Sequence, residues 1–165
     1  MKRLLAAFLC FIFTVSLLGG CSDPVGTPIV FEDLIVTLPA DFIELSQVGD
    51  AQDADLFYGR NTLIVKGLAE KKAIFIKKMT LEEYTSYVIS CNQLSCTPEP
   101  SGDGYLFTYE ATIGDTTYTY NTATFEGEIN FWIFQFYCPS ANLKENQPEI
   151  DIILESIQLK SSQKN

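Results

Sequence analysis

The chain has 165 residues, with 11 basic and 21 acidic side chains, and its formal net charge is −10. The acidic balance excludes nucleic acid as an expected partner, because binding it requires a clustered basic surface. The sequence contains no histidine, which excludes a Ser-His-Asp triad, a Cys-His nucleophile pair and zinc bound by histidine. It also lacks GxxxxGK[ST] and GxGxxG motifs, so we expect no phosphate-binding loop of those kinds and no cofactor.

The first 20 residues have the parts of a secretory signal peptide. Lys2 and Arg3 give it a positive start, residues 4–18 are mostly apolar, and Gly19-Gly20 places small residues before Cys21. This ending resembles the lipobox of bacterial lipoproteins. The resemblance implies that the peptide before Cys21 is removed and that the cysteine sulfur receives a diacylglyceryl group.

Such an anchor would hold the rest of the chain at a cell membrane, facing outside the cytoplasm. Burial contributes about 0.8 kcal/mol per CH₂ group, so two or three acyl chains bind permanently where a single chain is marginal. Two alternatives remain open. Residues 4–20 lie at the short limit for an uncleaved membrane-spanning helix, and Gly19-Gly20 also suits an ordinary signal peptidase.

Residues 21–28 comprise the lipidated cysteine and an expected tether. The segment Ser-Asp-Pro-Val-Gly-Thr-Pro is rich in turn formers, and its seven residues reach roughly 25 Å at most. Without the signal peptide the formal net charge becomes about −12, so anionic headgroups repel the domain within a Debye length of about 10 Å. We therefore expect the domain to stand off the membrane.

Residues 29–160 are expected to form one domain, followed by a polar tail at 161–165. Its first part is typical of strands. Residues 29–38 are β-branched and apolar, Pro39 closes this strand, and residues 42–45 form a second one. After a polar loop, residues 56–58 and 62–68 are expected to form a hairpin, and residues 70–78 fit either a sheet extension or a loop.

A helix is predicted from about Leu81 to about Asn92. Thr80 suits the N-cap position and Glu83 the N3 position, which together make a capping box. Met79 and Tyr84 occupy the two positions of a hydrophobic staple before and after the cap. Apolar side chains then recur at helical spacing.

Three long strands are predicted after a loop that contains Pro98 and Pro100. Residues 105–113 alternate between an apolar and a polar face, and Gly114-Asp115 turns the chain into residues 116–126. Residues 129–138 are apolar on both faces, with Gln135 the main exception, as expected for the middle of a sheet that is covered on both sides or nearly so.

The C-terminal part is expected to complete this cover. Pro148 suits the first turn of a helix, and Ile150, Ile153 and Leu154 lie on an apolar stripe that continues to Ile157. Residues 156–159 are then expected to form a last short strand.

This order of elements resembles the PsbP-like class of small secreted domains. The resemblance is carried by DLIVTLPADFIEL, MTLEEYTSYVI, YLFTYEATIGDTTYTYNTATFEGEINFWIFQFYC and PEIDIILESIQL, which cover most of residues 33–160. It implies an α+β fold, with a mainly antiparallel sheet covered by helices in an α/β/α sandwich. It also implies a binding or assembly partner, because the class shares no catalytic motif that these residues match.

Asp50, Asp53 and Asp55 are the best candidates for a metal site, since carboxylates on a loop suit Ca²⁺. The EF-hand pattern requires Asp or Asn two residues after Asp55, followed by Gly, and Phe57 stands there instead. We therefore interpret the three aspartates as a solvated acidic loop and expect no metal.

Two further groups of side chains have both a functional and a structural interpretation. Glu110, Glu126 and Glu128 offer a carboxylate pair for glycoside hydrolysis, but polar edges and turns of a sheet would show the same residues. The tyrosines could form an aromatic platform for a glycan or peptide, although packing under a helix is favoured. These tyrosines are Tyr105, Tyr109, Tyr118 and Tyr120.

Outside the signal peptide and Cys21, three cysteines remain. Cys91 and Cys96 lie close in sequence without the CxxC spacing of redox sites, so we predict a structural disulfide between them. A loop of that length would contribute roughly 2 kcal/mol. Cys138 is then expected to be a buried free thiol, and a bridge from Cys138 to either of the others remains an alternative.

Two functional classes are consistent with the sequence. The favoured one is a non-catalytic, lipid-anchored module that binds or assembles an envelope protein or a small ligand. The alternative is an acidic envelope enzyme or solute-capturing protein that uses surface carboxylates.

Overall fold

The protein is described by a computed structural model that covers residues 26–46, 52–75 and 77–160. The first strands are β1 (Gly26–Val30), β2 (Leu34–Pro39), β3 (Ile43–Glu44), β4 (Leu56–Arg60) and β5 (Leu63–Lys71). They are followed by η2 (Lys72–Ile74), α2 (Leu81–Cys91), β6 (Glu99–Ser101), β7 (Gly104–Ile113) and β8 (Thr116–Glu126). The last elements are β9 (Asn130–Pro139), η3 (Ser140–Asn142), α3 (Leu143–Glu155) and β10 (Gln158–Leu159).

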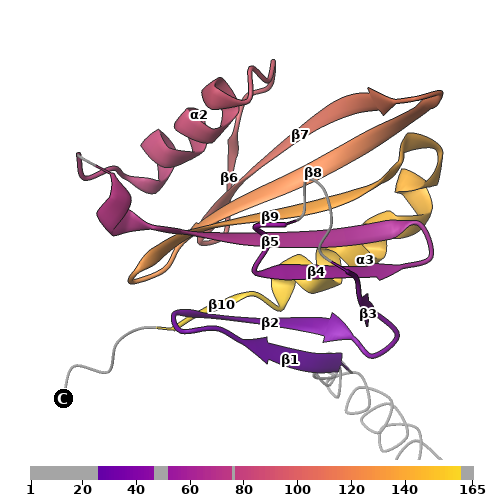
Figure 1. The fold of residues 1–165 in the computed structure, drawn as a ribbon, viewed down its shortest axis with the longest axis horizontal. Helices are drawn as coiled ribbons and strands as arrows, with labels where there is room; N and C mark the ends of the chain where they lie inside the picture. Colours follow the sequence, from indigo (N-terminus) through magenta and orange to yellow (C-terminus); the bar gives the residue numbers. More distant parts are fainter. Residues whose placement is uncertain (1–25, 47–51, 76, 161–165) are drawn as a thin grey trace, which may run out of the picture.

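The described elements pack in three layers, with a large antiparallel sheet in the middle (Figure 1). This sheet has seven strands in the order β3-β4-β5-β9-β8-β7-β6. Helix α2 lies on one face, while α3 and a three-stranded sheet of order β1-β2-β10 lie on the other. The predicted α+β sandwich is confirmed, and a small sheet shares one of its outer layers with α3.

Strand β9 occupies the centre of the large sheet, as its apolar pattern predicts. Its two faces bury different clusters of side chains. Trp132, Phe134 and Phe136 pack in the main core with β2 and α3, whereas Phe131 packs under α2. All four side chains are at most 2% exposed, so each face of this strand buries large apolar side chains.

The capping box of α2 is confirmed. The backbone N–H of Glu83 donates to the Thr80 hydroxyl at 3.2 Å, and the Glu83 carboxylate accepts from the Thr80 N–H at 3.0 Å. Two of the helix's unpaired N–H groups are thereby satisfied. Met79 and Tyr84 both pack in the cluster beneath the helix, which fits the predicted staple.

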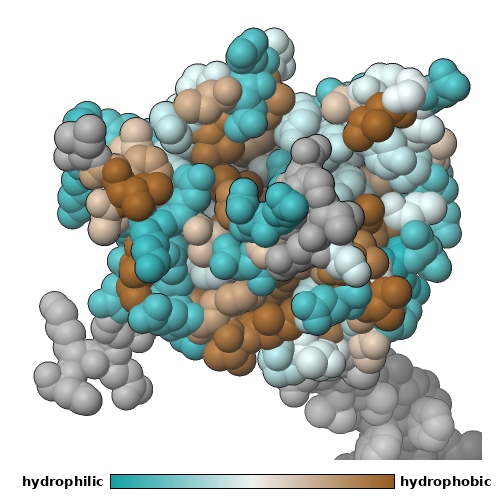
Figure 2. All heavy atoms as spheres, in the orientation of Figure 1, coloured by the Kyte–Doolittle hydropathy of each residue, from teal (hydrophilic) through white to brown (hydrophobic). Residues whose placement is uncertain are grey.

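The N-terminal part of the domain differs from the prediction. Residues 29–38 do not form one strand, because the chain turns at residues 31–33 and β1 pairs with β2 as a hairpin. Strand β1 begins at Gly26, so the last three residues of the expected tether belong to the small sheet. On the face shown in Figure 2, hydrophobic residues gather over this hairpin, where Val30 is 61% exposed.

Two further elements differ from the prediction. Strand β6 lies in the region predicted as a loop, and it pairs with the first residues of β7. Helix α3 begins at Leu143, so Pro148 is an interior residue and not part of the first turn. The 3₁₀ turn of η3 leads the chain into this helix earlier than the proline suggests.

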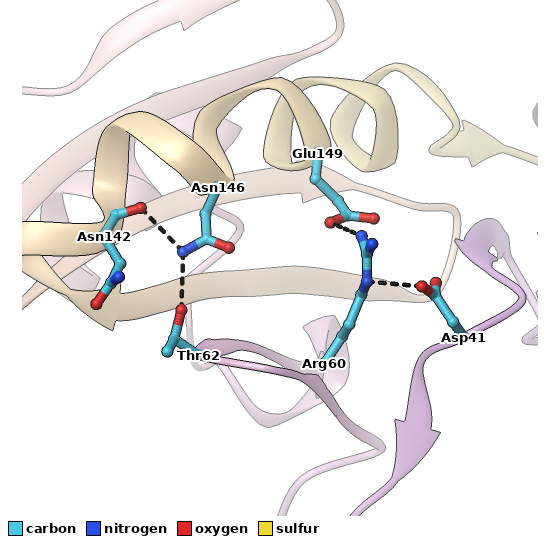
Figure 3. Close-up of polar contacts among 6 residues, drawn as sticks. All are labelled: Asp41, Arg60, Thr62, Asn142, Asn146 and Glu149. Carbon is cyan, nitrogen blue, oxygen red and sulfur yellow. Dashed lines mark hydrogen bonds and ion pairs between the residues drawn. The ribbon is translucent and has the colours of Figure 1, made fainter.

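Side-chain contacts fix the first half of α3 over β4 (Figure 3). The Asn146 amide donates to the Asn142 carbonyl at 3.0 Å and to the Thr62 hydroxyl at 3.1 Å. Arg60 contacts both the Glu149 carboxylate and, at 2.7 Å, that of Asp41. These contacts join the helix to the β4–β5 hairpin and to the turn after β2.

The turn between β1 and β2 carries a buried carboxylate. Asp33 is 3% exposed and accepts hydrogen bonds from the backbone N–H groups of Ile129 and Asn130, both at 2.9 Å. Its other oxygen accepts from the Trp132 indole N–H at 2.8 Å and from the Asn130 amide. A Cβ atom on Gly127 would lie 2.3 Å from this carboxylate, so the turn before β9 needs glycine there. Asp33 thus joins the small sheet to the large one.

Replacement of Asp33 is expected to destabilise the protein strongly. Asp33→Ala leaves several buried donors without an acceptor and should lower the free energy of unfolding by about 3 kcal/mol or more. Asp33→Asn keeps one acceptor oxygen and should cost less. The exposed neighbour Glu32 provides a control, since Glu32→Gln should change stability by no more than about 0.5 kcal/mol. Urea unfolding measures the difference, and an Asp33→Ala protein as stable as Glu32→Gln would contradict this role.

The contribution of Asp33 to the stability of the fold should also depend on pH. Burial raises the pKa of this carboxyl, but its hydrogen bonds outweigh that effect and hold the pKa below its ordinary value. Its stabilising effect is therefore fully present above the unfolded pKa of about 3.9 and is lost as the pH falls through the lower folded value. The stability difference between wild type and Asp33→Asn should be constant from pH 7 to 5 and shrink below pH 4. A difference that grows on acidification would contradict this expectation.

Candidate functional site

Helix α2 covers only part of its face of the large sheet. Its buried residues pack on Phe107 and Phe131, near the end of the sheet away from the β7–β8 turn (Figure 1). Beyond them the same face continues with half-buried side chains, of which Tyr109 still packs against the cluster under α2. We call this region the open face, and it comprises Lys66, Tyr109, Tyr120, Gln135 and Tyr137.

Three tyrosines form a stacked row across the open face. Strand register places Tyr109 opposite Tyr120 and Tyr120 opposite Tyr137. Their ring centroids are 4.8 and 4.9 Å apart, with interplanar angles of 6° and 18°. These separations match the spacing of neighbouring strands, so the rings turn their flat faces largely toward one another. The row therefore offers ring edges and hydroxyl groups more than a flat platform.

Gln135 is the main polar exception that the sequence shows within β9, and the structure gives it a partner. Its side-chain amide donates to the Tyr109 hydroxyl at 2.9 Å, reaching from β9 to β7 across the intervening β8. Burial, together with the nearby Tyr120 and Cys96, raises the pKa of Tyr109 to about 12. The phenol is therefore neutral at physiological pH and can donate a hydrogen bond.

A groove of about 350 Å³ lies where the open face meets α2. We call it the α2 groove. Its polar lining comes from both the sheet and the helix. The polar and titratable side chains that line it are Lys66, Glu70, Tyr87, Cys91, Asn92 and Gln135.

Several polar groups of the α2 groove have hydrogen-bond partners in the domain. The Glu70 carboxylate accepts from the Tyr84 hydroxyl at 2.9 Å, and Asn92 donates to the Val88 carbonyl at 2.8 Å. A hydrogen bond between Tyr87 and the Cys91 thiol raises the pKa of Tyr87. The groove thus combines an ammonium, a carboxylate, amides and a phenol, which suits recognition of a polar, mostly neutral ligand or peptide surface.

The structure separates two of the candidate carboxylates. Glu110 on β7 pairs with Thr119 on β8. Glu126 lies seven residues beyond Thr119 along β8, on the other face of the sheet. At about 3.3 Å per residue this is roughly 23 Å, whereas a glycosidase pair needs about 5 to 9.5 Å. Glu110 accepts from Thr119, and Glu126 pairs with Lys72 at 2.7 Å. Glu128 lies in the turn before β9. A pair made of Glu110 and Glu126 is therefore ruled out by geometry.

The remaining tyrosine candidates are divided. Tyr109 and Tyr120 belong to the open face, Tyr118 lies nearer the β7–β8 turn, and Tyr105 lines a different cleft described below. Tyr137 completes the row but was not a candidate. Tyr137 can be recognised as part of the row only from the register of β8 and β9, which pairs it with Tyr120.

The three aspartates that were considered as calcium ligands lie partly outside the described residues, which do not include Asp50. Asp53 and Asp55 are exposed, and the Asp55 carboxylate accepts from the Ala69 N–H at 2.7 Å. Asp55 thus has a structural contact with β5. Across the described ranges, no group of three or more His, Cys, Asp or Glu side chains is placed to hold a metal ion.

Three cysteines are described, and all are free thiols: Cys91 is exposed, Cys96 is partly buried and Cys138 is buried. The structure contains no bridge between Cys91 and Cys96, and their pairing stays a prediction. Cys138 is buried, as expected. Burial raises the pKa values of the Cys96 and Cys138 thiols, and for Cys138 it outweighs a hydrogen bond with Asn146. Cys21 lies outside the described residues.

Cysteine labelling should separate these environments. In unreduced protein from an oxidising compartment, mass spectrometry should find the peptides of Cys91 and Cys96 linked. Iodoacetamide should modify Cys138 only after unfolding, because its thiol is buried and thiolates are the reactive form. A Cys138→Ser variant serves as a control for peptide assignment. A disulfide-linked Cys138 peptide would contradict the expected pairing.

No protein-family profile matches the chain, and no curated protein matches it. Several solved protein structures superpose on it. A protein of Bacteroides thetaiotaomicron VPI-5482 superposes with a TM-score of 0.56 at 13% identity, and the match covers 83% of this chain but only 49% of that one. The cyanobacterial PsbP protein CyanoP of Synechocystis sp. PCC 6803 superposes with a TM-score of 0.57 at 10% identity, covering 87% and 99% of the two chains. LpqN of Mycobacterium tuberculosis, described as involved in cell envelope biogenesis, gives 0.50 at 12%, covering 86% and 88%.

These matches define the class of fold. The antiparallel sheets, the two α-helices of the described residues and the superposition on CyanoP show a PsbP-like α+β fold. Identities of 10 to 13% show a shared fold and not a shared activity. In the part of the chain that the structure covers, no helix has the length and apolar character to cross a membrane.

Proposed function

We propose that this chain is a lipid-anchored, extracytoplasmic protein whose PsbP-like domain is a non-catalytic binding or assembly module at the cell envelope. The observation that carries the binding proposal is the open face with its adjoining α2 groove. There a stacked tyrosine row, the Lys66 ammonium group and the Gln135 amide lie on the sheet, beside the Asn92 amide at the end of α2. The sequence of the first 21 residues supports the anchor.

The open face has the character of a protein-binding surface. Tyrosine is enriched in such surfaces because it joins a large apolar ring to a hydrogen-bonding hydroxyl group. The three rings are half-buried and stacked, so little conformational entropy remains to be lost when a partner binds. The fold likeness to LpqN, which is described as involved in envelope biogenesis, is compatible with this proposal.

The alternative of an acidic enzyme or solute-capturing protein receives less support. The α2 groove contains one carboxylate among its described lining residues, Glu70, and that carboxylate accepts a hydrogen bond from Tyr84. Catalysis of the glycosidase type would need a second carboxylate facing it across the substrate.

Substitution of the lipobox cysteine tests the anchor. Cys21→Ala should leave the precursor unprocessed or release the protein from the membrane fraction, because the residue that carries the acyl chains is lost. Cys10→Ala is the matched control, since Cys10 lies within the apolar segment and should be dispensable. Fractionation and intact-mass measurement report both outcomes. Normal cleavage after residue 20 with full membrane retention of Cys21→Ala would refute the lipoprotein proposal.

Charge reversal in the α2 groove tests the binding surface. Lys66→Glu replaces the ammonium group of the groove lining with a second carboxylate and should reduce recovery of crosslinked envelope partners at least fivefold. Lys144→Glu makes the same charge change on an exposed position of α3 and should leave recovery unchanged. Crosslinking in intact cells, followed by purification of the anchored protein and mass spectrometry, gives the comparison. Equal recovery with both variants would place the binding surface elsewhere.

A further inference from the structure

A second cleft lies on the opposite side of the large sheet, between the β6–β7 turn and the end of α3. It has a volume of about 370 Å³, within the range of small-ligand sites. The open face and the α2 groove share no lining residue with it. We propose that this cleft binds a small organic cation, an ammonium group carried on an apolar body. The proposal is independent of the lipid anchor and of the binding surface proposed above.

The walls of the cleft are apolar. The ring of Phe125 lies directly against Gly104, where a Cβ atom would approach its Cε1 atom to 2.8 Å. Several partly buried side chains continue this wall and also pack against the main core, so the cleft adjoins the edge of the hydrophobic interior. The apolar residues that line it are Leu106, Phe125, Leu154, Ile157 and Leu159.

The charges at the cleft are of one sign. Asp103 and Glu155 are exposed carboxylates at its rim, and none of the lining residues is basic. Asp103 comes from the β6–β7 turn and Glu155 from the last residue of α3, so the two acids lie on the two elements that bound the cleft. The chain as a whole has a formal net charge of −10, which also attracts cations.

These features together favour a hydrophobic cation over other ligands. An anion would be repelled by the charged side chains of the lining, which are both acidic, and a fully hydrated metal ion would gain nothing from the apolar wall. A cation with an apolar body can place its body on Phe125 and the leucine side chains while its charge faces Asp103 and Glu155. Tyr105 also lines the cleft, but strand alternation places its side chain with that of Phe107 on the other face of the sheet, so the two carboxylates carry the recognition of charge.

The test compares three probes of one shape and different charge: benzylammonium, benzyl alcohol and benzoate. The full-length protein is held in nanodiscs of neutral lipid, and empty nanodiscs supply the blank. Saturation-transfer NMR gives the dissociation constants. Benzylammonium should bind at least tenfold more tightly than benzyl alcohol, benzoate should show no binding, and the preference should fall at high salt because screening weakens exposed charges.

Paired substitutions locate the site. Asp103→Asn combined with Glu155→Gln should weaken benzylammonium binding at least fivefold and leave benzyl alcohol unchanged. Asp115→Asn is the matched control, because Gly114-Asp115 forms the β7–β8 turn as Gly102-Asp103 forms the β6–β7 turn, far from the cleft. No binding of benzylammonium, equal affinity for the alcohol, or an equal loss in Asp115→Asn would each overturn the proposal.

Discussion

The Asp33 carboxylate is the contact on which the arrangement of the two sheets depends. A charged group with 3% exposure is costly to bury unless its oxygens are satisfied, and here they accept four hydrogen bonds from the start of β9 and the turn before it. Because β9 is the central strand, this contact fixes the β1–β2 hairpin relative to the middle of the large sheet. The hairpin and α3 can then cover one face of that sheet, which leaves α2 to cover part of the other.

The incomplete cover given by α2 has chemical consequences. Where the helix lies, aromatic rings meet in a closed cluster, as in the stacked pair Tyr84 and Phe131 at 4.2 Å. Where it does not, the same strand faces carry tyrosine in place of phenylalanine, so that hydroxyl groups reach the surface. One sheet therefore supplies both a core and a polar, rigid surface, with Gln135 at the boundary between them.

Local and periodic signals account for what the sequence predicted well. The capping box needs only Thr80 and Glu83, three residues apart, and a strand that is apolar on both faces must lie inside a sheet. The features that the sequence did not predict depend on contacts with residues on other strands or far away in the chain. Nothing near Asp33 reveals that its donors lie 96 to 99 residues away, so residues 29–38 were interpreted as one strand. Tyr137 was missed because the tyrosine row requires the register of three strands, and β6 was missed because Glu-Pro-Ser resembles a loop.

The early start of β1 limits how the domain can move if Cys21 is acylated. Only four residues then separate the anchor from Gly26, and at about 3.5 Å per residue they span roughly 14 Å. The small sheet would be the membrane-proximal side, and the domain could swivel but not rise far from the lipid surface. Its search for partners would become two-dimensional, which raises the effective concentration of any partner in the same leaflet and makes a weak contact sufficient.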